Sequence, residues 1–146
     1  MSDQPKLPPK RVIRFFTALN VWVYRLTGGR AMNKMEGAPV CLVTMTGRKS
    51  GRKKTIALMY TAHGQDVLLV ASLGGAPQHP AWYYNLKAHP EIEIQVGRVR
   101  RRMRAREASP EEKRALWPVA VANYRSFAAY QQRTSREIPL FVCSPA

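Results

Sequence analysis

The sequence predicts a mainly β protein with helices (α+β class), built as a small antiparallel barrel whose gaps are filled by helices. Three observations lead to this prediction. The expected elements run in the order helix, three strands, helix, strand hairpin, helices and a last strand. Helices do not alternate with every strand, as a doubly wound parallel sheet would require. The 146 residues show no internal repeat and no linker, and they are enough to bury one substantial core.

The N-terminal region, 1–36, is expected to hold a polar, Pro-rich tail and an amphipathic helix, followed by the barrel domain at 37–146. Between Arg11 and Leu26 the apolar residues follow the i, i+3, i+4, i+7 spacing of a helix: Val12, Phe15, Phe16, Leu19, Val23 and Leu26. Gly28 and Gly29 end it. Two interpretations stay open, a helix packed on the barrel or a basic helix that touches an anionic membrane.

The first three strands are marked by β-branched enrichment and by glycine-containing turns. Residues 40–46 form the first, and the second follows a basic turn, from Thr55 to Thr61. Gly64-Gln65-Asp66 makes the next turn. Val67–Ser72 is almost continuously apolar, which indicates a central strand, and Gly74 and Gly75 break it.

A short helix and a hairpin follow. The helix begins at Pro80 and ends near Ala88, since Pro90 disfavours helical geometry at His89. Glu91–Val96 alternates polar and apolar residues, as a half-buried strand does. After Gly97 the chain continues into Arg98–Arg106, where every even position is Arg, so this strand must present its arginines to solvent or to an anion.

The C-terminal part returns to helices and ends in a strand. Ser109-Pro-Glu-Glu112 is a capping box with proline at the first helical position, and this helix is expected to run towards Asn123. A second short helix covers Ser126–Gln132. Ile138–Cys143 is the last apolar strand.

Composition limits the classes of function. The formal charge is +15 and the sequence pI is about 10.6, so the protein should attract polyanions. Nucleic acid, anionic lipid and a phosphorylated cofactor or substrate all fit this charge. Cys41 and Cys143 are too few for a disulfide framework, and the histidines lack metal-ligand spacing, so we expect no metal site.

The expected compartment is the cytoplasm, with membrane association as the alternative. Asp3, Gln4 and Pro5 do not fit the charged-then-apolar pattern of a signal peptide. No apolar run approaches the ~18 residues that a membrane span needs.

The segment Gly47–Lys54 is the strongest candidate for an anion site. It places five cations within Arg48–Lys54, between two strands. Glycines let backbone N–H groups approach an anion, and Arg and Lys donate charge-assisted bonds to phosphate oxygens. A solvated turn remains the alternative. It is not a Walker loop, because the GxxxxGK[ST] spacing is absent.

Aromatic residues supply the second candidate. In Pro80–Lys87, Trp82 and Tyr83 could form the wall of a planar-ring site, while Asn85 could hold the helix to the basic loop. Core packing is the alternative for these residues, and also for Tyr124, Phe127 and Tyr130. No GxSxG or Ser-His-Asp arrangement appears and carboxylates are few, which favours chemistry carried by a cofactor.

Four segments together resemble the deazaflavin-dependent nitroreductase family. They are VTMTGRKSG at 43–51, LVASLGG at 69–75, PAWYYNLKAHP at 80–90 and REIPL at 136–140, in this order across roughly Pro39 to Cys143. The resemblance implies a split β-barrel, FMN-binding-like, among the flavin and deazaflavin oxidoreductases. It also implies use of coenzyme F420, a deazaflavin with a phosphate and a poly-glutamate tail.

The resemblance also implies a residue set. Arg48, Lys49 and Ser50 would bind the phosphate and tail, with Lys54 beside them. The other cofactor-binding residues would be Thr55, Ile56, Ala57, Leu58, Met59, Val70, Ala71, Ser72, Leu73, Ala81, Trp82, Tyr83, Tyr84, Asn85 and Phe127. Tyr124 and Tyr130, with Met59 and Ser72, would form the substrate side, and Tyr124, Tyr130, Ser72 or water would supply the proton.

The chain departs from the family pattern at four of these positions. Leu73 stands where relatives often carry a basic residue, and Ala57 replaces a common proline. Met59 and Phe127 stand where nitroimidazole-activating members have tyrosines. Two hydroxyls are thereby missing from the expected pocket, which weakens the case for nitro-drug activation and leaves the reductase prediction intact.

The predicted function is hydride transfer from reduced F420 to an electron-poor small molecule, such as a quinone, an activated alkene or enone, or a nitro compound. The partner is this acceptor, and no nucleic acid is expected. Peripheral membrane contact would occur through the N-terminal helix, and the protein would be a monomer or dimer. Two alternatives are an FMN-binding split-barrel oxidoreductase and a basic nucleic-acid- or membrane-binding module without catalysis.

Overall fold

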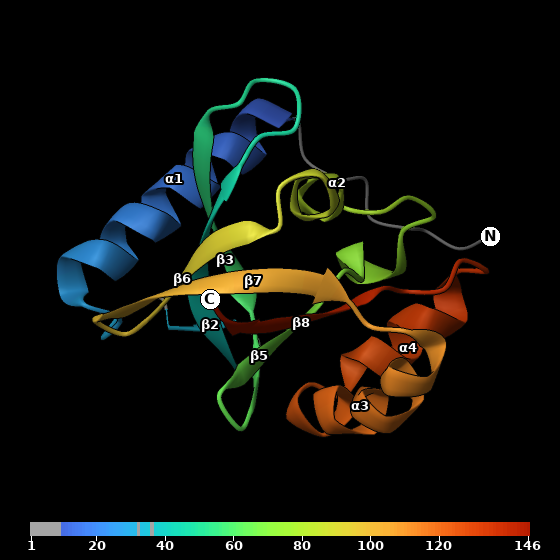
Figure 1. Cartoon of the computed structure of the whole chain (residues 1–146). Coiled ribbons are helices and arrows are strands. Elements are labelled where there is room, and N and C mark those ends of the chain that lie inside the picture. Colours follow the sequence, from blue (N-terminus) through green and yellow to red (C-terminus); the bar gives the residue numbers. More distant parts are fainter. Residues whose placement is uncertain (1–9, 32, 36) are drawn as a thin grey trace.

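The computed structural model describes residues 10–31, 33–35 and 37–146, with side chains from residue 19 onward except at Met35. Its centre is an antiparallel sheet that, within these residues, has eight strands and rolls into a barrel (Figure 1). The strands are β1 Lys34–Met35, β2 Ala38–Thr46, β3 Lys53–Met59, β4 Thr61–His63, β5 Asp66–Val70, β6 Glu91–Val96, β7 Val99–Glu107 and β8 Leu140–Pro145. The helices are α1 Lys10–Thr27, α2 Ala81–Ala88, α3 Pro110–Asn123 and α4 Ser126–Arg133, with a 3₁₀ turn, η1, at Leu73–Gly75.

The barrel closes through one bent stretch of chain. The ladder runs β1-β2-β6-β7-β8-β5-β4, and β3 pairs with β2. This stretch is residues 53–63: its first part, β3, pairs with β2, and its last part, β4, which follows after Tyr60, pairs with β5. The single strand expected over Thr55–Thr61 is therefore two strands. In the described residues no ladder joins β3 to β5, and this opening is the split of the barrel.

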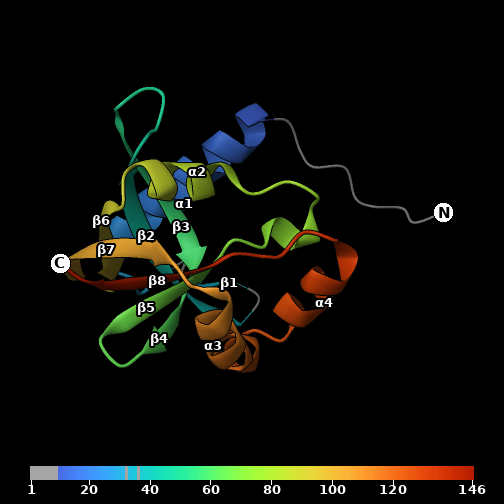
Figure 2. The same ribbon diagram turned by 45° about the vertical axis from the view of Figure 1, so that its right-hand side comes forward.

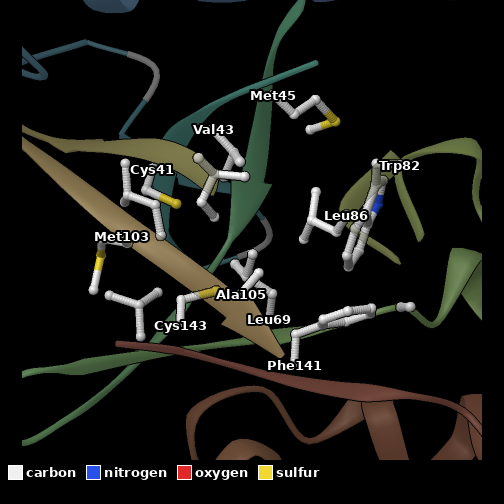
Figure 3. Packing of buried hydrophobic residues seen from close by; sticks show 14 residues of the cluster. Cys41, Val43, Met45, Leu69, Trp82, Leu86, Met103, Ala105, Phe141 and Cys143 are labelled. Atoms are coloured by element: carbon white, nitrogen blue, oxygen red, sulfur yellow. The ribbon is translucent and has the colours of Figure 1, made fainter. Parts of the chain in front are cut away.

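The barrel interior is filled by alternate residues of the strands. Cys41, Val43 and Met45 of β2 point inwards, where they meet Leu69 of β5 and Phe141 of β8 (Figure 3). Helix α2 closes one end by inserting Trp82 and Leu86. Strand β5 is buried on both faces, because Leu68 belongs to a second apolar cluster outside the barrel. The prediction of a central strand there is confirmed.

Helix α1 lies on the outside of β2 and β3, with Val21 and Tyr24 buried against Leu42. The Tyr24 hydroxyl accepts a hydrogen bond of 2.7 Å from the Gly97 amide, which ties the helix to the β6–β7 turn. The buried face differs from the apolar stripe read from the sequence: Leu19 and Leu26 are 41% and 70% exposed. Trp22 is also exposed. The side chains of Val12, Phe15 and Phe16 lie outside the described residues.

Helices α3 and α4 pack on the opposite side of the barrel from α1 (Figures 1 and 2). The capping box predicted at the start of α3 is confirmed: the Ser109 hydroxyl accepts from the Glu112 amide at 3.2 Å. Ala120, Tyr124 and Phe127 face Leu68, Leu140 and Val142 of the barrel. None of the helices in the described residues is long and apolar enough to cross a membrane.

The arginine strand, β7, has two different faces. Met103 and Ala105 are buried in the barrel, whereas the even-numbered arginines of β7 are exposed: Arg100, Arg102, Arg104 and Arg106. Arg104 pairs with Glu91 on the neighbouring strand, and Arg106 pairs with Glu112 of α3. The prediction that these arginines reach solvent is confirmed.

Candidate functional site

Two cavities, of about 280 and 660 Å³, lie along β3, and we call them together the cleft. Both are lined by residues of β3 and by residues at the start of α2. The smaller cavity is apolar and aromatic, and we call it the aromatic half. The larger one surrounds the β2–β3 turn, and we call it the basic half.

The basic half is built by the turn Gly47–Arg52, which projects beyond the barrel (Figures 1 and 2). The Gly47 amide donates to the Arg52 carbonyl at 2.9 Å, and the Gly51 amide donates to the Gly47 carbonyl at 2.9 Å. Gly51 has φ of 68°, a conformation that glycine adopts at little cost. The five cations, Arg48, Lys49, Arg52, Lys53 and Lys54, are exposed and, among the described residues, none pairs with a carboxylate. Their charge is therefore available to an anion.

Asn85 fastens this turn to helix α2. Its side-chain oxygen accepts a hydrogen bond of 3.0 Å from the Arg48 amide, and its side chain is buried. The Arg48 guanidinium also lies 4.7 Å from the centre of the Tyr84 ring, a cation–π distance. The prediction that Asn85 holds helix to loop is confirmed.

The aromatic half is bounded by Ala57–Met59 of β3 on one side, and by Tyr124, Phe127 and Tyr130 on the other. The Tyr124 and Tyr130 hydroxyls lie 3.1 Å apart and share a hydrogen bond. The Phe127 ring meets that of Tyr124 edge to face, with centroids 4.9 Å apart. An apolar chamber with a pair of hydroxyls suits a planar ligand that carries oxygen atoms.

A turn after β5 completes the wall of the aromatic half with Ser72, Leu73 and Gly74. Leu73 has φ of 45°, which is rare for a residue with a side chain. Its exposed side chain lies at the edge of the cavity. Arg136, which is not among the lining residues, donates to the carbonyls of Ala71, Ser72 and Ala76.

The structure brings most of the predicted site residues to this cleft. The aromatic half is lined by Ala57, Leu58, Met59, Val70, Ser72, Leu73, Trp82, Tyr124, Phe127 and Tyr130. The basic half is lined by Arg48, Lys49, Ser50, Lys54, Ala81 and Asn85. Five other predicted residues lie outside both linings: Thr55, Ile56, Ala71, Tyr83 and Tyr84.

Local contacts explain where these five residues lie. Thr55 is on the outer face of β3, hydrogen-bonded to Thr44 at 2.8 Å. Ala71 is fully buried, Ile56 packs against the barrel core, and Tyr83 stacks on His79 with centroids 4.2 Å apart. Tyr84 touches the basic half only through the Arg48 guanidinium.

Several lining residues were not singled out from the sequence. Arg52 and Lys53 belong to the basic turn, so their charge was the available signal. Gly74 and Pro80, in the segment that leads into α2, also line the aromatic half. Arg136 was noted only as part of a motif, because nothing local shows that its side chain reaches Ala71–Ala76.

The chemistry of the two halves fits a long ligand with a planar ring at one end and several negative charges at the other. Exposed, unpaired cations bind phosphate and carboxylate groups through charge-assisted hydrogen bonds. The aromatic half offers the flat apolar walls that a ring system requires. F420 combines these two features, so the residues present fit that cofactor.

The comparisons with known proteins agree with this arrangement. A family described as F420H(2)-dependent quinone reductase matches residues 16–145. The chain belongs to this family. An F420H(2)-dependent quinone reductase of Mycobacterium tuberculosis is 40% identical over 124 residues, which are 82% of this chain and 83% of the relative.

Two solved structures extend the comparison. One, described as an F420-H2 dependent reductase (FDR-A), has a TM-score of 0.68 and 41% identity, covering 73% of this chain and 94% of that one. The other, described as a domain-swapped dimer, has a TM-score of 0.71 and 34% identity, covering 94% and 100%. The predicted split-barrel fold, the F420-dependent oxidoreductase class and the cofactor are therefore confirmed at the level of the family.

Proposed function

We propose that this member of the family reduces a quinone with reduced F420. The observation that carries the proposal is the cleft itself, whose basic half and aromatic half are both lined by residues of β3 and of the start of α2. Relatives at about 40% identity are named F420H(2)-dependent quinone reductases, which supports a quinone over an enone or a nitro compound. The acceptor would enter the aromatic half.

In the basic half, the proposed role of Arg48, Lys49, Ser50 and Lys54 is to hold the phosphate and glutamate tail. Arg52 and Lys53 border the same cavity and would add to the positive field. Asn85 would keep this turn aligned with α2 through its bond to the Arg48 amide. Each charged hydrogen bond contributes about 1.5–3 kcal/mol, so a few of them suffice for tight binding.

In the aromatic half, bound F420 would supply the hydride. The chain's own contribution is orientation, because Met59, Leu73 and Phe127 restrict a planar acceptor to one slot. Holding reactants in a near-attack geometry lowers the barrier by as much as about 7–11 kcal/mol. The Tyr130 and Tyr124 hydroxyls, and that of Ser72, would hold the acceptor oxygen and deliver a proton to it.

Two measurements test the proposal. Titration with F420 should change the cofactor's fluorescence with saturation at micromolar protein. With reduced F420, purified protein should reduce menadione faster than a cyclic enone or a nitroimidazole. Absence of F420 binding would overturn the cofactor assignment for this chain, and a preference for enone or nitro compound would overturn the quinone assignment.

The FMN alternative makes a distinct prediction. An FMN-binding split barrel would be purified yellow and would release flavin on denaturation, whereas the proposed reductase purified from a host without F420 is colourless. The binding-module alternative predicts nucleic-acid affinity that falls steeply with salt and does not compete with F420.

We also propose that α1 contacts an anionic membrane. The observation in favour is an exposed apolar row on its outer face, Leu19, Trp22 and Leu26, beside the exposed cation Arg25. Such a face suits the interface between headgroups and acyl chains. Wild-type protein should sediment with vesicles that contain phosphatidylglycerol, and Trp22→Ser/Leu26→Ser should remain in solution. Equal sedimentation of both would overturn the contact through α1, and failure of the wild type to sediment would overturn the membrane contact itself.

A further inference from the structure

Arg136 lies in the segment that leads into β8, and its guanidinium is saturated by one short stretch of chain. Nε donates to the Ala76 carbonyl at 2.9 Å, and Nη2 donates to the Ser72 carbonyl at 2.8 Å. Both terminal nitrogens also reach the Ala71 carbonyl at 3.3 Å. Nη1 donates to His79 Nδ1 at 2.9 Å, so that nitrogen carries no proton. These bonds use every N–H donor of the group, which leaves none for a ligand.

All of these partners are neutral, although guanidinium groups in proteins usually meet carboxylates or phosphates. The positive charge is therefore solvated only by backbone carbonyl oxygens of residues 71–76 and by the imidazole of His79. Burial lowers the pKa of Arg136, and the group still stays charged at any physiological pH. The side chain is half-buried, and all five of its N–H groups are directed at residues 71–79.

The backbone that it fixes is strained. Leu73, Gly74 and Gly75 are consecutive residues with positive φ, of 45°, 64° and 81°. Left-handed backbone is unfavourable for leucine, and such residues persist only where the surroundings impose the conformation. The carbonyls that Arg136 binds come immediately before this turn, at Ala71 and Ser72, and immediately after it, at Ala76.

The same turn is pressed against helix α4. A Cβ atom on Gly75 would lie 2.8 Å from the Tyr130 carbonyl oxygen and 3.0 Å from the Arg133 Cβ. The turn therefore fixes the distance between the Ser72–Leu73 wall and the helix that carries Tyr130 and Phe127. Both segments line the aromatic half.

We propose that Arg136 is a positioning residue for the acceptor side of the cleft, where it holds the strained turn Leu73–Gly75 in register with α4. It touches neither cofactor nor acceptor. Only the identity of the acceptor rests on the proposed quinone reduction. The hydrogen bonds by which Arg136 holds the turn, which we call the clamp, do not depend on it. Lysine is not equivalent, since an ammonium group has three donors and no planar fork, whereas Arg136 uses five N–H groups.

Two variants test the proposal, Arg136→Lys and Arg136→Met, beside Arg100→Met as a matched loss of an exposed charge. Both Arg136 variants should lower kcat/KM for menadione by about 10-fold or more, because a misplacement of about 1 Å costs up to about 10²-fold. The Kd for F420 should stay within about twofold, since none of the residues that Arg136 binds by hydrogen bonds lines the basic half. Arg100→Met should change neither value.

A second measurement, made on the protein without cofactor, tests the clamp independently of activity. Amide hydrogen exchange of the apo protein should accelerate in 71–79 and stay unchanged in the barrel strands. Faster exchange throughout the chain, or an equal loss of F420 affinity and kcat/KM, would show a general destabilisation and overturn the proposal. If Arg136→Lys has the kcat/KM and the amide exchange rates of wild type, the guanidinium group is not required and the proposal is overturned.

A rescue experiment asks whether strain is what the clamp opposes. Leu73→Gly removes the unfavourable side chain, so Arg136→Lys should lower the thermal midpoint less in that background than in wild type. An equal loss in both backgrounds would overturn the strain argument. If wild-type protein fails to reduce menadione, the quinone proposal falls, while exchange and thermal midpoints still decide on the clamp.

Discussion

The two halves of the cleft are built in opposite ways. The basic half takes all of its cations from one continuous segment, 48–54, and these cations extend into solvent, with Ala81 and Asn85 of α2 beside them. The aromatic half gathers residues from β3, the end of β5, η1, α2, the end of α3 and α4, and several of them also belong to apolar clusters. The basic half can therefore change without disturbing the fold, whereas the aromatic half cannot.

This difference suggests a division of tasks. A solvated, unpaired cation loses little when it is replaced, and the cost appears only when an anion is bound. Tyr124 and Phe127, in contrast, are 7% and 5% exposed, so their packing supports the contact between α3, α4 and the barrel. We expect affinity for the cofactor to depend on the basic half and the rate of reduction on the aromatic half.

The largest expected effect concerns the paired hydroxyls. Tyr124→Phe/Tyr130→Phe keeps both rings and removes the hydrogen bond of 3.1 Å. We expect kcat for menadione to fall by about 10²-fold, the usual scale for losing a positioned proton donor. The Kd for F420, measured by fluorescence, should hardly change.

Tyr130→Phe alone separates the two hydroxyls, and the thermal midpoint of each variant controls for packing. A variant with wild-type kcat would show that the proton comes from Ser72 or water. A large loss of F420 affinity would break the division between the halves.

The second effect concerns the basic half. Arg48→Ala/Lys49→Ala should raise the Kd for F420 by about 10–100-fold, since each charged hydrogen bond contributes about 1.5–3 kcal/mol and exposure reduces that value. At saturating F420 the kcat should match wild type. Fluorescence titration and steady-state kinetics check the two parts.

Arg100→Ala/Arg102→Ala is the matched control, because it removes the same charge from the exposed face of β7. An equal rise in Kd for this control would mean that the net charge of +15, and not the turn, attracts the cofactor. Added salt should weaken F420 binding to wild type more than to Arg48→Ala/Lys49→Ala.

The two halves also differ in how far the sequence predicts them. The basic half is one run of charge between two strands, so composition and order suffice, and even the bond from Asn85 follows from its place on a short helix. For the aromatic half, the residues alone leave Tyr124, Phe127 and Tyr130 open between core and site. Their gathering at the split was implied only by resemblance to a family.

What the sequence misses depends on contacts between distant residues. The break at Tyr60 arises because the chain exchanges one pairing partner, β2, for another, β5, and its own residues carry no sign of that exchange. The left-handed backbone at Leu73 opposes the local preference of leucine and persists through Arg136, which lies 63 positions further along the chain. On α1, periodicity identified an apolar stripe, but the residues that are buried against the barrel are Val21 and Tyr24.

The smallest expected effect is a pH dependence that reaches the aromatic half through His79. Its Nδ1 accepts from Arg136, and its ring stacks on Tyr83 with Tyr84 beside it. Burial, and then the charge of Arg136, lower the pKa of His79, against a smaller opposing effect of Glu107 on β7. Protonation would remove the lone pair that Arg136 uses.

The sign follows from the direction of this shift. Below pH 6.5, the ordinary pKa of histidine, His79 takes up a proton in the unfolded chain more readily than in the folded protein. The contribution of His79 to the free energy of unfolding is therefore fully present above pH 6.5, and it is lost as pH falls through the lower pKa of the folded state. His79→Asn offers an oxygen in place of Nδ1 and does not titrate, so its free energy of unfolding should fall less over this window. If the free energy of unfolding falls equally with pH in wild type and in His79→Asn, the pH dependence does not come from His79. In wild type, kcat/KM for menadione should decline with this loss. The Kd for F420 should change less, because His79 binds Arg136 directly and reaches the basic half only through the edge of Tyr84.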